Sequence, residues 1–204
     1  MPTLRTIISD LYHQRSNGVV GVGLLGSRSP LETRTLSPFF RVEENATPIT
    51  VSFDGAPDHM ARVTAATPGA ANGSCLFFHD EWSTVATLNR AKRIVLGGGY
   101  SGCLYSVYST GTGEYKCVHT ARPKGPMSDA FVGGIRAYAA EQHWTLVHEV
   151  PTVGGVGVGG CVTTFMATRV SYTINPTPVV RTVRLRQNAQ GFSVGQDRFE
   201  TPSA

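Results

Sequence analysis

Most of the chain consists of short apolar and β-branched runs that end at glycine, proline or asparagine, which is the pattern of strands separated by turns. The runs that predict strands are 18–26, 49–53, 75–78, 94–100, 104–109, 114–120, 144–150, 161–173 and 178–187. Apolar residues recur at helical spacing in residues 3–13, 80–89 and 129–142, and Ser128 is a suitable N-cap for the third segment. We therefore predict an α+β fold, a mostly antiparallel β-sandwich flanked by two or three short helices.

The length of 204 residues fits one domain. Residues 1–190 are predicted to form this single domain, and the polar residues 191–204 a C-terminal tail. Residues 154–160 are rich in glycine but lack the lysine and serine or threonine of a phosphate-binding loop, so they predict a tight connection between strands. Loops are also predicted over residues 28–34, 43–48 and 66–74.

Charge is sparse and dispersed along the chain: 16% of the residues are charged, the net charge is +4, and no run of five basic residues occurs. This pattern argues against a nucleic-acid partner. No apolar run approaches the ~18 residues of a membrane span, and no signal peptide is recognisable. Cys75 and His79 form one Cys-x-x-x-His pair without the second pair that a zinc site needs, so we expect neither a metal nor another cofactor.

A candidate reactive pair is formed by Cys103, in the sequence Ser101-Gly102-Cys103, and His119, on the two arms of a predicted β-hairpin. If the loop comprises residues 110–112, Cys103 lies directly opposite His119, with Cβ atoms roughly 4.5–5.5 Å apart. A four-residue loop instead pairs Cys103 with Thr120 and turns His119 to the other face, and the turn residues accept both lengths. In the first register the imidazole is close enough to take the thiol proton and create a nucleophilic thiolate.

The alternation of strand residues places Cys103 and Tyr105 on the same face as Cys117 and His119. Cysteine is also among the most frequently buried residues, so Cys103 has a purely structural interpretation too. The glycines at 97–99 favour the chemical interpretation, because they let a substrate approach the backbone and leave amide groups for an oxyanion. Cys117 is expected to pack in the interior, or to act as a disulfide or sulfenic-acid partner of Cys103.

Residues 96–119 resemble the active-site segment of the Cys-His glutamine deamidases, which include the catalytic domains of the cytotoxic necrotizing factors and the Burkholderia lethal factor toxin. The shared features are a Ser-Gly-Cys at the start of a strand and a histidine on the far arm of a hairpin. The resemblance implies a β-sandwich with added helices and loops, with Cys103 as nucleophile and His119 as general base. Backbone amides near Ser101, Gly102 and Cys103 would hold the oxyanion.

The resemblance leaves the third member of the site open. Some members place a threonine six residues before the cysteine to orient the histidine, and this position is Gly97 here. Other members use a backbone carbonyl, which leaves no trace in a sequence. The candidates are therefore the side chains of Tyr100 and Tyr105 and the backbone of Gly97.

The function implied by the resemblance is that of a protein-glutamine deamidase, a hydrolase that acts through a thioester and needs no cofactor. It further implies a bacterial toxin or effector, exported without a recognisable signal peptide, whose partner is a protein with a target glutamine in a host cytosol. A protein of the bacterial cytoplasm is the alternative, and a monomer is expected in either case. A primary amine in place of water would make the same site a transglutaminase.

Two other classes of protein are compatible with parts of the pattern. Peptidase-like and amidase-like Cys-His hydrolases place the cysteine at a helix N-terminus, whereas residues 104–109 are β-branched and aromatic and predict a strand. A non-enzymatic β-sandwich that binds a partner through its glycine-rich loops predicts an unreactive Cys103.

Overall fold

The computed structural model describes residues 18–20, 42–44, 46–54, 60–77, 79, 83–100, 102–122, 126–152, 156–157, 160–161, 164–172, 178–188 and 191–201. Its strands are β1 (Gly18–Val20), β2 (Val42–Glu44), β3 (Ala46–Asp54), β4 (Met60–Ala65), β5 (Gly73–Leu76), β6 (Ser83–Leu88), β7 (Ile94–Tyr100), β8 (Leu104–Ser109), β9 (Tyr115–Thr120), β10 (Thr145–Pro151), β11 (Val156–Gly157), β12 (Gly160–Cys161), β13 (Thr164–Ser171), β14 (Val179–Asn188) and β15 (Gly191–Glu200). The described residues contain one helix, α2 (Met127–Glu141), and no helix among them is long and apolar enough to cross a membrane. The predicted α+β class is confirmed.

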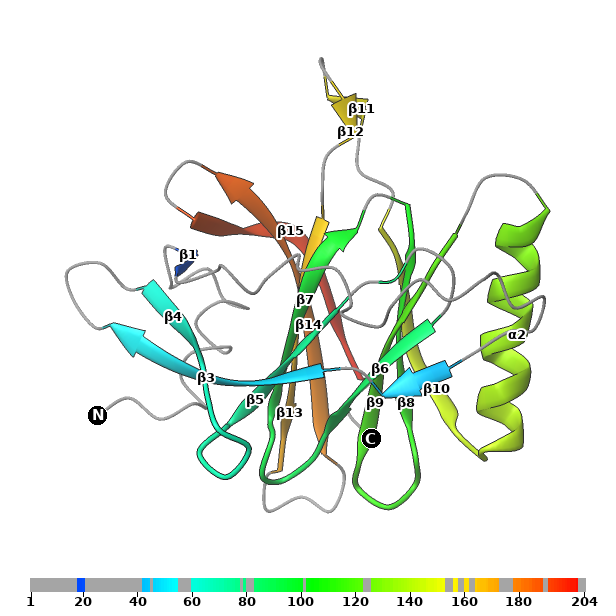
Figure 1. Cartoon of the computed structure of the whole chain (residues 1–204), viewed down its shortest axis with the longest axis horizontal. Coiled ribbons are helices and arrows are strands. Elements are labelled where there is room, and N and C mark those ends of the chain that lie inside the picture. The colour runs from blue at the N-terminus through cyan, green and yellow to red at the C-terminus, as the bar shows by residue number, and fades with distance from the viewer. Residues whose placement is uncertain are drawn as a thin grey trace.

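Two sheets carry the fold. One is a closed barrel with the strand order β1-β15-β14-β13-β7-β5-β3-β4, and the other is a five-stranded sheet with the order β10-β8-β9-β6-β2. Figure 1 shows the barrel on the left, the five-stranded sheet on the right and α2 outside that sheet. Most of the described strand pairs are antiparallel, as predicted, with parallel pairing in β1–β4, β5–β7 and β2–β6. A barrel beside an open sheet does not confirm the predicted sandwich.

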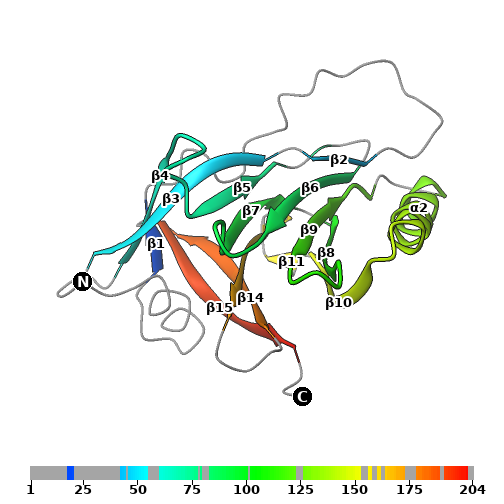
Figure 2. The same ribbon diagram turned by 90° about the horizontal axis from the view of Figure 1, so that it is seen from below.

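The five-stranded sheet separates two apolar cores, because it lies between α2 and the barrel (Figure 2). Its outer face carries Val85, Tyr108 and Val118, which pack against Ile135 and Ala139 of α2. Its inner face packs against the barrel. The buried residues of this larger core are Leu76, Ala86, Leu88, Val95, Tyr100, Tyr105, Val107, Tyr115, Cys117, Val150, Met166, Val170 and Val180. Side chains that alternate along β8 and β9 therefore point to one core or the other.

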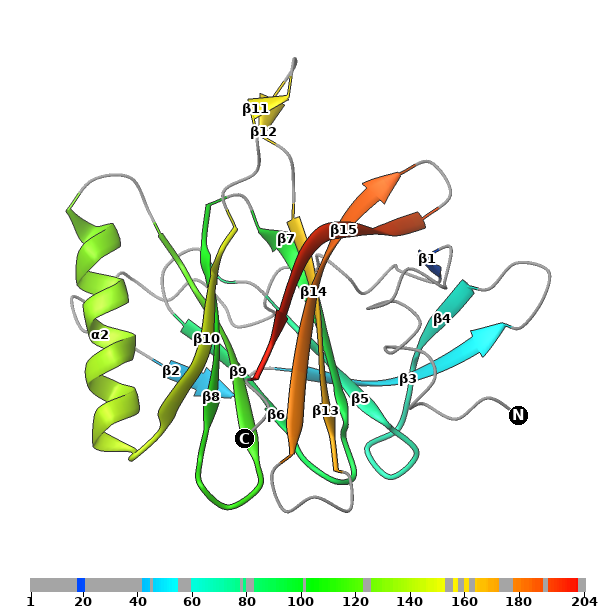
Figure 3. The same cartoon turned by 180° about the vertical axis from the view of Figure 1, so that it is seen from behind.

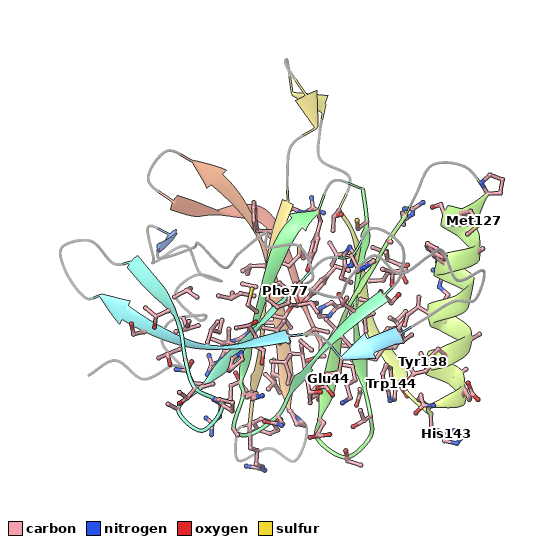
Figure 4. The ribbon with its side chains drawn as sticks, in the orientation of Figure 1. Glu44, Phe77, Met127, Tyr138, His143 and Trp144 are labelled. Atoms are coloured by element: carbon pink, nitrogen blue, oxygen red, sulfur yellow. The ribbon has the colours of Figure 1, made fainter. Side chains whose placement is uncertain are left out.

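The helix predicted over 129–142 is confirmed, although it begins two residues earlier, at Met127. Ser128 lies inside its first turn and accepts a hydrogen bond from Nε of Arg122, so it is not the predicted N-cap. Beyond the end of the helix, Trp144 meets the ring of Tyr138 edge-on at 5.5 Å between centroids (Figure 4). This aromatic contact fixes the lower end of α2 against the sheet.

Three predictions of local structure are wrong. The helix expected over 80–89 is replaced in its described part by β6, which contains three β-branched residues and pairs with β9 and β2. Residues 43–48, expected as a loop, belong largely to β2 and the start of β3. The expected tail begins with β15, which pairs with β14 and β1 and so completes the barrel beyond the predicted boundary at 190. The polar side chains of this segment suggested a tail, but strands pair through hydrogen bonds between backbone groups, which polar residues form as well as apolar ones.

Among the other predicted segments, one is confirmed and three lie wholly or partly outside the described residues. The glycine-rich residues 154–160 contribute to β11 and β12, which form a two-stranded hairpin and confirm the predicted connection. The predicted helix over 3–13, the loop over 28–34 and the later part of the strand over 18–26 lie outside the described residues. The β11–β12 hairpin projects from the upper edge of the molecule, the edge at which β7 and β10 end and β8 begins (Figure 3).

Candidate functional site

The sequence-predicted site residues gather at one edge, where the barrel meets the five-stranded sheet. Tyr100 ends β7, Cys103 directly precedes β8, and His119 lies near the end of β9. Tyr105 lies in β8, directly opposite His119. Ser101, predicted to support the oxyanion, lies outside the described residues.

The register of the β8–β9 hairpin differs from both predicted registers. The amide of Thr110 donates to the carbonyl of Glu114 at 3.1 Å, so the tight turn comprises residues 111–113 rather than 110–112. Gly111 and Gly113 have φ values of +79° and +82°, which favour glycine and place the turn at these two positions. The prediction that Cys103 lies directly opposite His119 is therefore wrong.

The observed register nevertheless keeps Cys103 and His119 on the same face. Tyr105 is the cross-strand partner of His119, and Cys103 lies two residues before Tyr105. Cys103 packs against the same core as Tyr105 and Cys117, so the predicted sharing of a face is confirmed. Cysteine and histidine are thus diagonal neighbours, a relation in which Cβ atoms lie about 7 Å apart and long side chains still interact.

Thr152, which follows β10, holds the backbone around the cysteine. Its hydroxyl and its amide both donate to the carbonyl of Cys103, at 2.6 and 3.1 Å. The amide of Gly102 donates in return to the carbonyl of Thr152 at 3.1 Å, and Gly102 has a φ of +119° that favours glycine. Cys103 itself is partly exposed, whereas Thr152 is buried.

These bonds change the prediction for the oxyanion site. Because the amide of Gly102 already donates to Thr152, it is not available to a substrate unless that bond breaks. The predicted oxyanion role of Gly102 is therefore not supported in this conformation. That role stays a prediction for Ser101 and for the amide of Cys103.

His119 is fully buried in the wall of the site. Burial lowers the pKa of its imidazole to about 3, and the nearby His79 side chain contributes to the same shift. The ring is therefore neutral near pH 7. The backbone amide of His79 donates to Nδ1 at 3.4 Å, which assigns the proton of the neutral ring to Nε2.

The three candidates for a third member have different surroundings. The ring of Tyr100 stacks on the imidazole of His119, with centroids 4.8 Å apart and planes 21° apart. The hydroxyl of Tyr105 instead bonds to Thr168 Oγ1 at 2.6 Å, across the interface between the two sheets. Gly97 lies beside Tyr100, and a Cβ atom at Gly97 would be 2.5 Å from the tyrosine hydroxyl.

The hydroxyl of Tyr105 belongs to a buried hydrogen-bond chain between the two sheets. Thr168 continues the chain to Thr182 at 2.8 Å, and Thr182 contacts Nε2 of His148 at 2.6 Å. Burial lowers the pKa of His148 to about 4, so this ring too is neutral near pH 7. The chain connects β8 and β10 to β13 and β14 and holds Tyr105 in place.

Cys75 and Cys117 differ from Cys103 in their burial. Both are buried, and burial raises the pKa of each thiol to about 12. Both are thus protonated and poorly nucleophilic near pH 7. Cys117 pairs across the hairpin with Val107 and packs in the larger core, in agreement with its predicted packing role.

Two contacts of the site were missed from the sequence. Thr152 carries no signal beyond its position directly after a predicted strand. The sequence indicated His79 only as half of an incomplete metal site. Its contribution in the structure is the backbone amide that donates to His119, and a backbone donor has no signature in the sequence. Within the described residues there is no group of three or more side chains suited to a metal ion.

Replacing Thr152 by valine is expected to lower the free energy of unfolding by about 1 kcal/mol, because the carbonyl of Cys103 loses its hydroxyl donor. Alkylation of Cys103 by iodoacetamide should become faster as the loop loosens. The control is Thr64→Val, the same change at an exposed position of β4. Equal stability and alkylation rates in the two variants would contradict the role given to Thr152.

In comparisons with known proteins, no family model matches the chain, and no curated protein matches it.

Proposed function

We propose that the protein deamidates glutamine side chains of a protein substrate, with Cys103 as nucleophile and His119 as general base. The observation that carries the proposal is their placement as diagonal neighbours on one face of the β8–β9 hairpin, at an edge of the sheet. Cys103 is partly exposed to an approaching substrate, and His119 lies in the adjacent wall as a neutral imidazole.

The reaction follows from these two groups. The sulfur of Cys103 bonds to the amide carbon of glutamine while its proton passes to Nδ1 of His119, the unprotonated nitrogen, which gives up its 3.4 Å bond from the amide of His79 in this step. The protonated ring then gives this proton to the amide nitrogen, the carbon–nitrogen bond breaks, and ammonia leaves behind a thioester. Water attacks the thioester with His119 again as base, and the proton returns to the sulfur as glutamate is released. A primary amine in place of water would give a transglutaminase.

The low pKa of His119 bears on the first step. A ring that is neutral near pH 7 is in the form that accepts a proton, but it is a weak base in its buried position. The proton transfer is therefore concerted with attack of the sulfur, when the negative charge that develops on the substrate oxygen balances the positive charge on the ring. A resting thiolate–imidazolium pair is not part of this proposal.

The wider biological role is proposed on the resemblance of residues 96–119 alone. It is that of a bacterial toxin or effector, acting as a monomer on a protein of a host cytosol.

The proposal is tested by incubating the protein with candidate host proteins and measuring their intact masses. We expect a gain of about one dalton for each converted glutamine, together with release of one ammonia. Adding a primary amine separates the two acceptors, because transamidation adds the mass of the amine minus ammonia. Ammonia release that is identical in the Cys103→Ser variant would contradict the proposal.

A further inference from the structure

We infer that Tyr100 is a positioning residue for His119, holding the imidazole in one orientation and one tautomer at the candidate site. The catalytic part of this inference rests on the proposed function, but the effect on the ring of His119 does not. Tyr100 ends β7 of the barrel and His119 lies on β9 of the open sheet, so the contact joins the two halves of the fold at the site.

The imidazole is constrained in two ways. The stacked ring of Tyr100, 4.8 Å away and tilted by 21°, limits rotation of the imidazole plane. The backbone amide of His79 donates to Nδ1 and selects which edge of the ring faces it. Because both aromatic side chains are fully buried, neither ring has solvent into which to turn. Together the two contacts favour one orientation and one tautomer.

The position of Tyr100 depends on the glycine three residues earlier. A Cβ atom at Gly97 would lie 2.5 Å from the hydroxyl of Tyr100 and 2.8 Å from the carbonyl oxygen of Leu76. These distances are too short for any side chain at position 97. The hydroxyl therefore occupies space that only glycine leaves open, and this seats the ring against His119.

The stacked ring also matters when charge develops. Burial raises the pKa of Tyr100 well above 10, and charge on the neighbouring cysteines, including Cys103, acts in the same direction. Tyr100 thus remains a neutral phenol beside the reactive thiol. When His119 accepts the thiol proton, its positive charge lies over the electron-rich face of the tyrosine ring, which is a favourable cation–π contact.

The matched variants are Tyr100→Met and Tyr108→Met. Methionine fills much of the lost volume without a planar ring. Tyr108 is buried like Tyr100 but faces α2, on the other side of the five-stranded sheet. Tyr100→Phe serves as the conservative rescue, because it keeps the stacking ring and removes only the hydroxyl.

The first measurement is ¹⁵N NMR of the imidazole nitrogens of His119, which needs no substrate. In the wild type and in Tyr100→Phe we expect one protonated and one unprotonated nitrogen with well-separated shifts. In Tyr100→Met the two shifts should converge as the tautomers interconvert. In Tyr108→Met they should stay apart. Separated shifts in Tyr100→Met would overturn the inference, whether or not the protein is a deamidase.

The second measurement is turnover of a protein substrate. We expect kcat to fall about 10-fold in Tyr100→Met with KM unchanged, and Tyr100→Phe to restore it, since the ring acts on the proton transfer rather than on binding. Equal kcat in Tyr100→Met and Tyr108→Met would also overturn the inference. If Tyr100→Met does not fold, Tyr100→Leu, which also lacks a planar ring, takes its place in both measurements and is judged by the same outcomes.

Discussion

Replacing Cys103 by serine is expected to reduce glutamine deamidation by about 1000-fold or more, while the free energy of unfolding changes by less than about 1 kcal/mol. A serine hydroxyl is far less acidic than a thiol, and the weakly basic imidazole of His119 is unable to compensate. Stability is little affected because the side chain is partly exposed and its backbone bonds to Thr152 remain. Intact-mass analysis of the substrate and chemical denaturation measure the two effects.

The matched control is Cys117→Ser, which makes the same atomic change on the same face of the hairpin. Cys117 is fully buried, so this variant should lose stability and keep its turnover as long as it stays folded. His119→Gln, which keeps a polar side chain of similar length, should lose activity about 100-fold or more. Near-normal turnover in Cys103→Ser or in a folded His119→Gln would show that the assigned roles are wrong.

The protein is expected to lose about 2–3 kcal/mol of its free energy of unfolding between pH 7 and pH 5.5. In the folded chain the pKa values of His119 and His148 lie at about 3 and about 4, whereas an unfolded histidine titrates near 6.5. The unfolded chain therefore binds protons first as the pH falls. The contribution of both rings is present above pH 6.5 and is lost progressively toward the folded pKa values. Urea denaturation across this range measures the change.

The controls for this pH dependence are single variants at two histidines. His148→Gln should reduce the loss of stability between pH 7 and 5.5 by about half, since one of the two buried rings is gone. A folded His119→Gln should remove the other half, since it removes the second buried ring. A free energy of unfolding that is flat from pH 7 to 5.5 would contradict the neutral burial of His119 and His148.

The fold was predictable where the pattern of residues acts locally. The apolar stripe of Phe131, Ile135 and Ala139 predicted α2, and the same three residues are buried in it. The prediction failed at β6, where pairing with strands distant in the sequence overrides the local signal, and at β15, whose polar residues concealed a hairpin with the adjacent β14. β6 is held between β9 and β2, and β15 between β14 and β1. A short window of sequence around β15 contains β14, but no such window contains β1 with β15, or β2 and β9 with β6.

The candidate site shows the same division. The sequence predicted Cys103, His119 and their shared face, because two-residue alternation follows from strand geometry alone. It did not predict the register, which the positive φ values at Gly111 and Gly113 determine through one particular turn. The glycine found where some of the resembling deamidases have a threonine had no explanation in the sequence. In the structure the hydroxyl of Tyr100 lies beside it.

The sequence by itself determined the residue chemistry of this protein, its strand-rich class and the hairpin that carries a thiol and an imidazole, since these depend on residue types and on spacing along the chain. The tertiary structure decided how far apart on the hairpin the two groups lie, that the imidazole is buried and neutral, and that Thr152, His79 and Tyr100 surround them. Burial, stacking and backbone donors are properties of segments brought together from β5, β7, β9 and β10. They exist only once the barrel has closed against the open sheet.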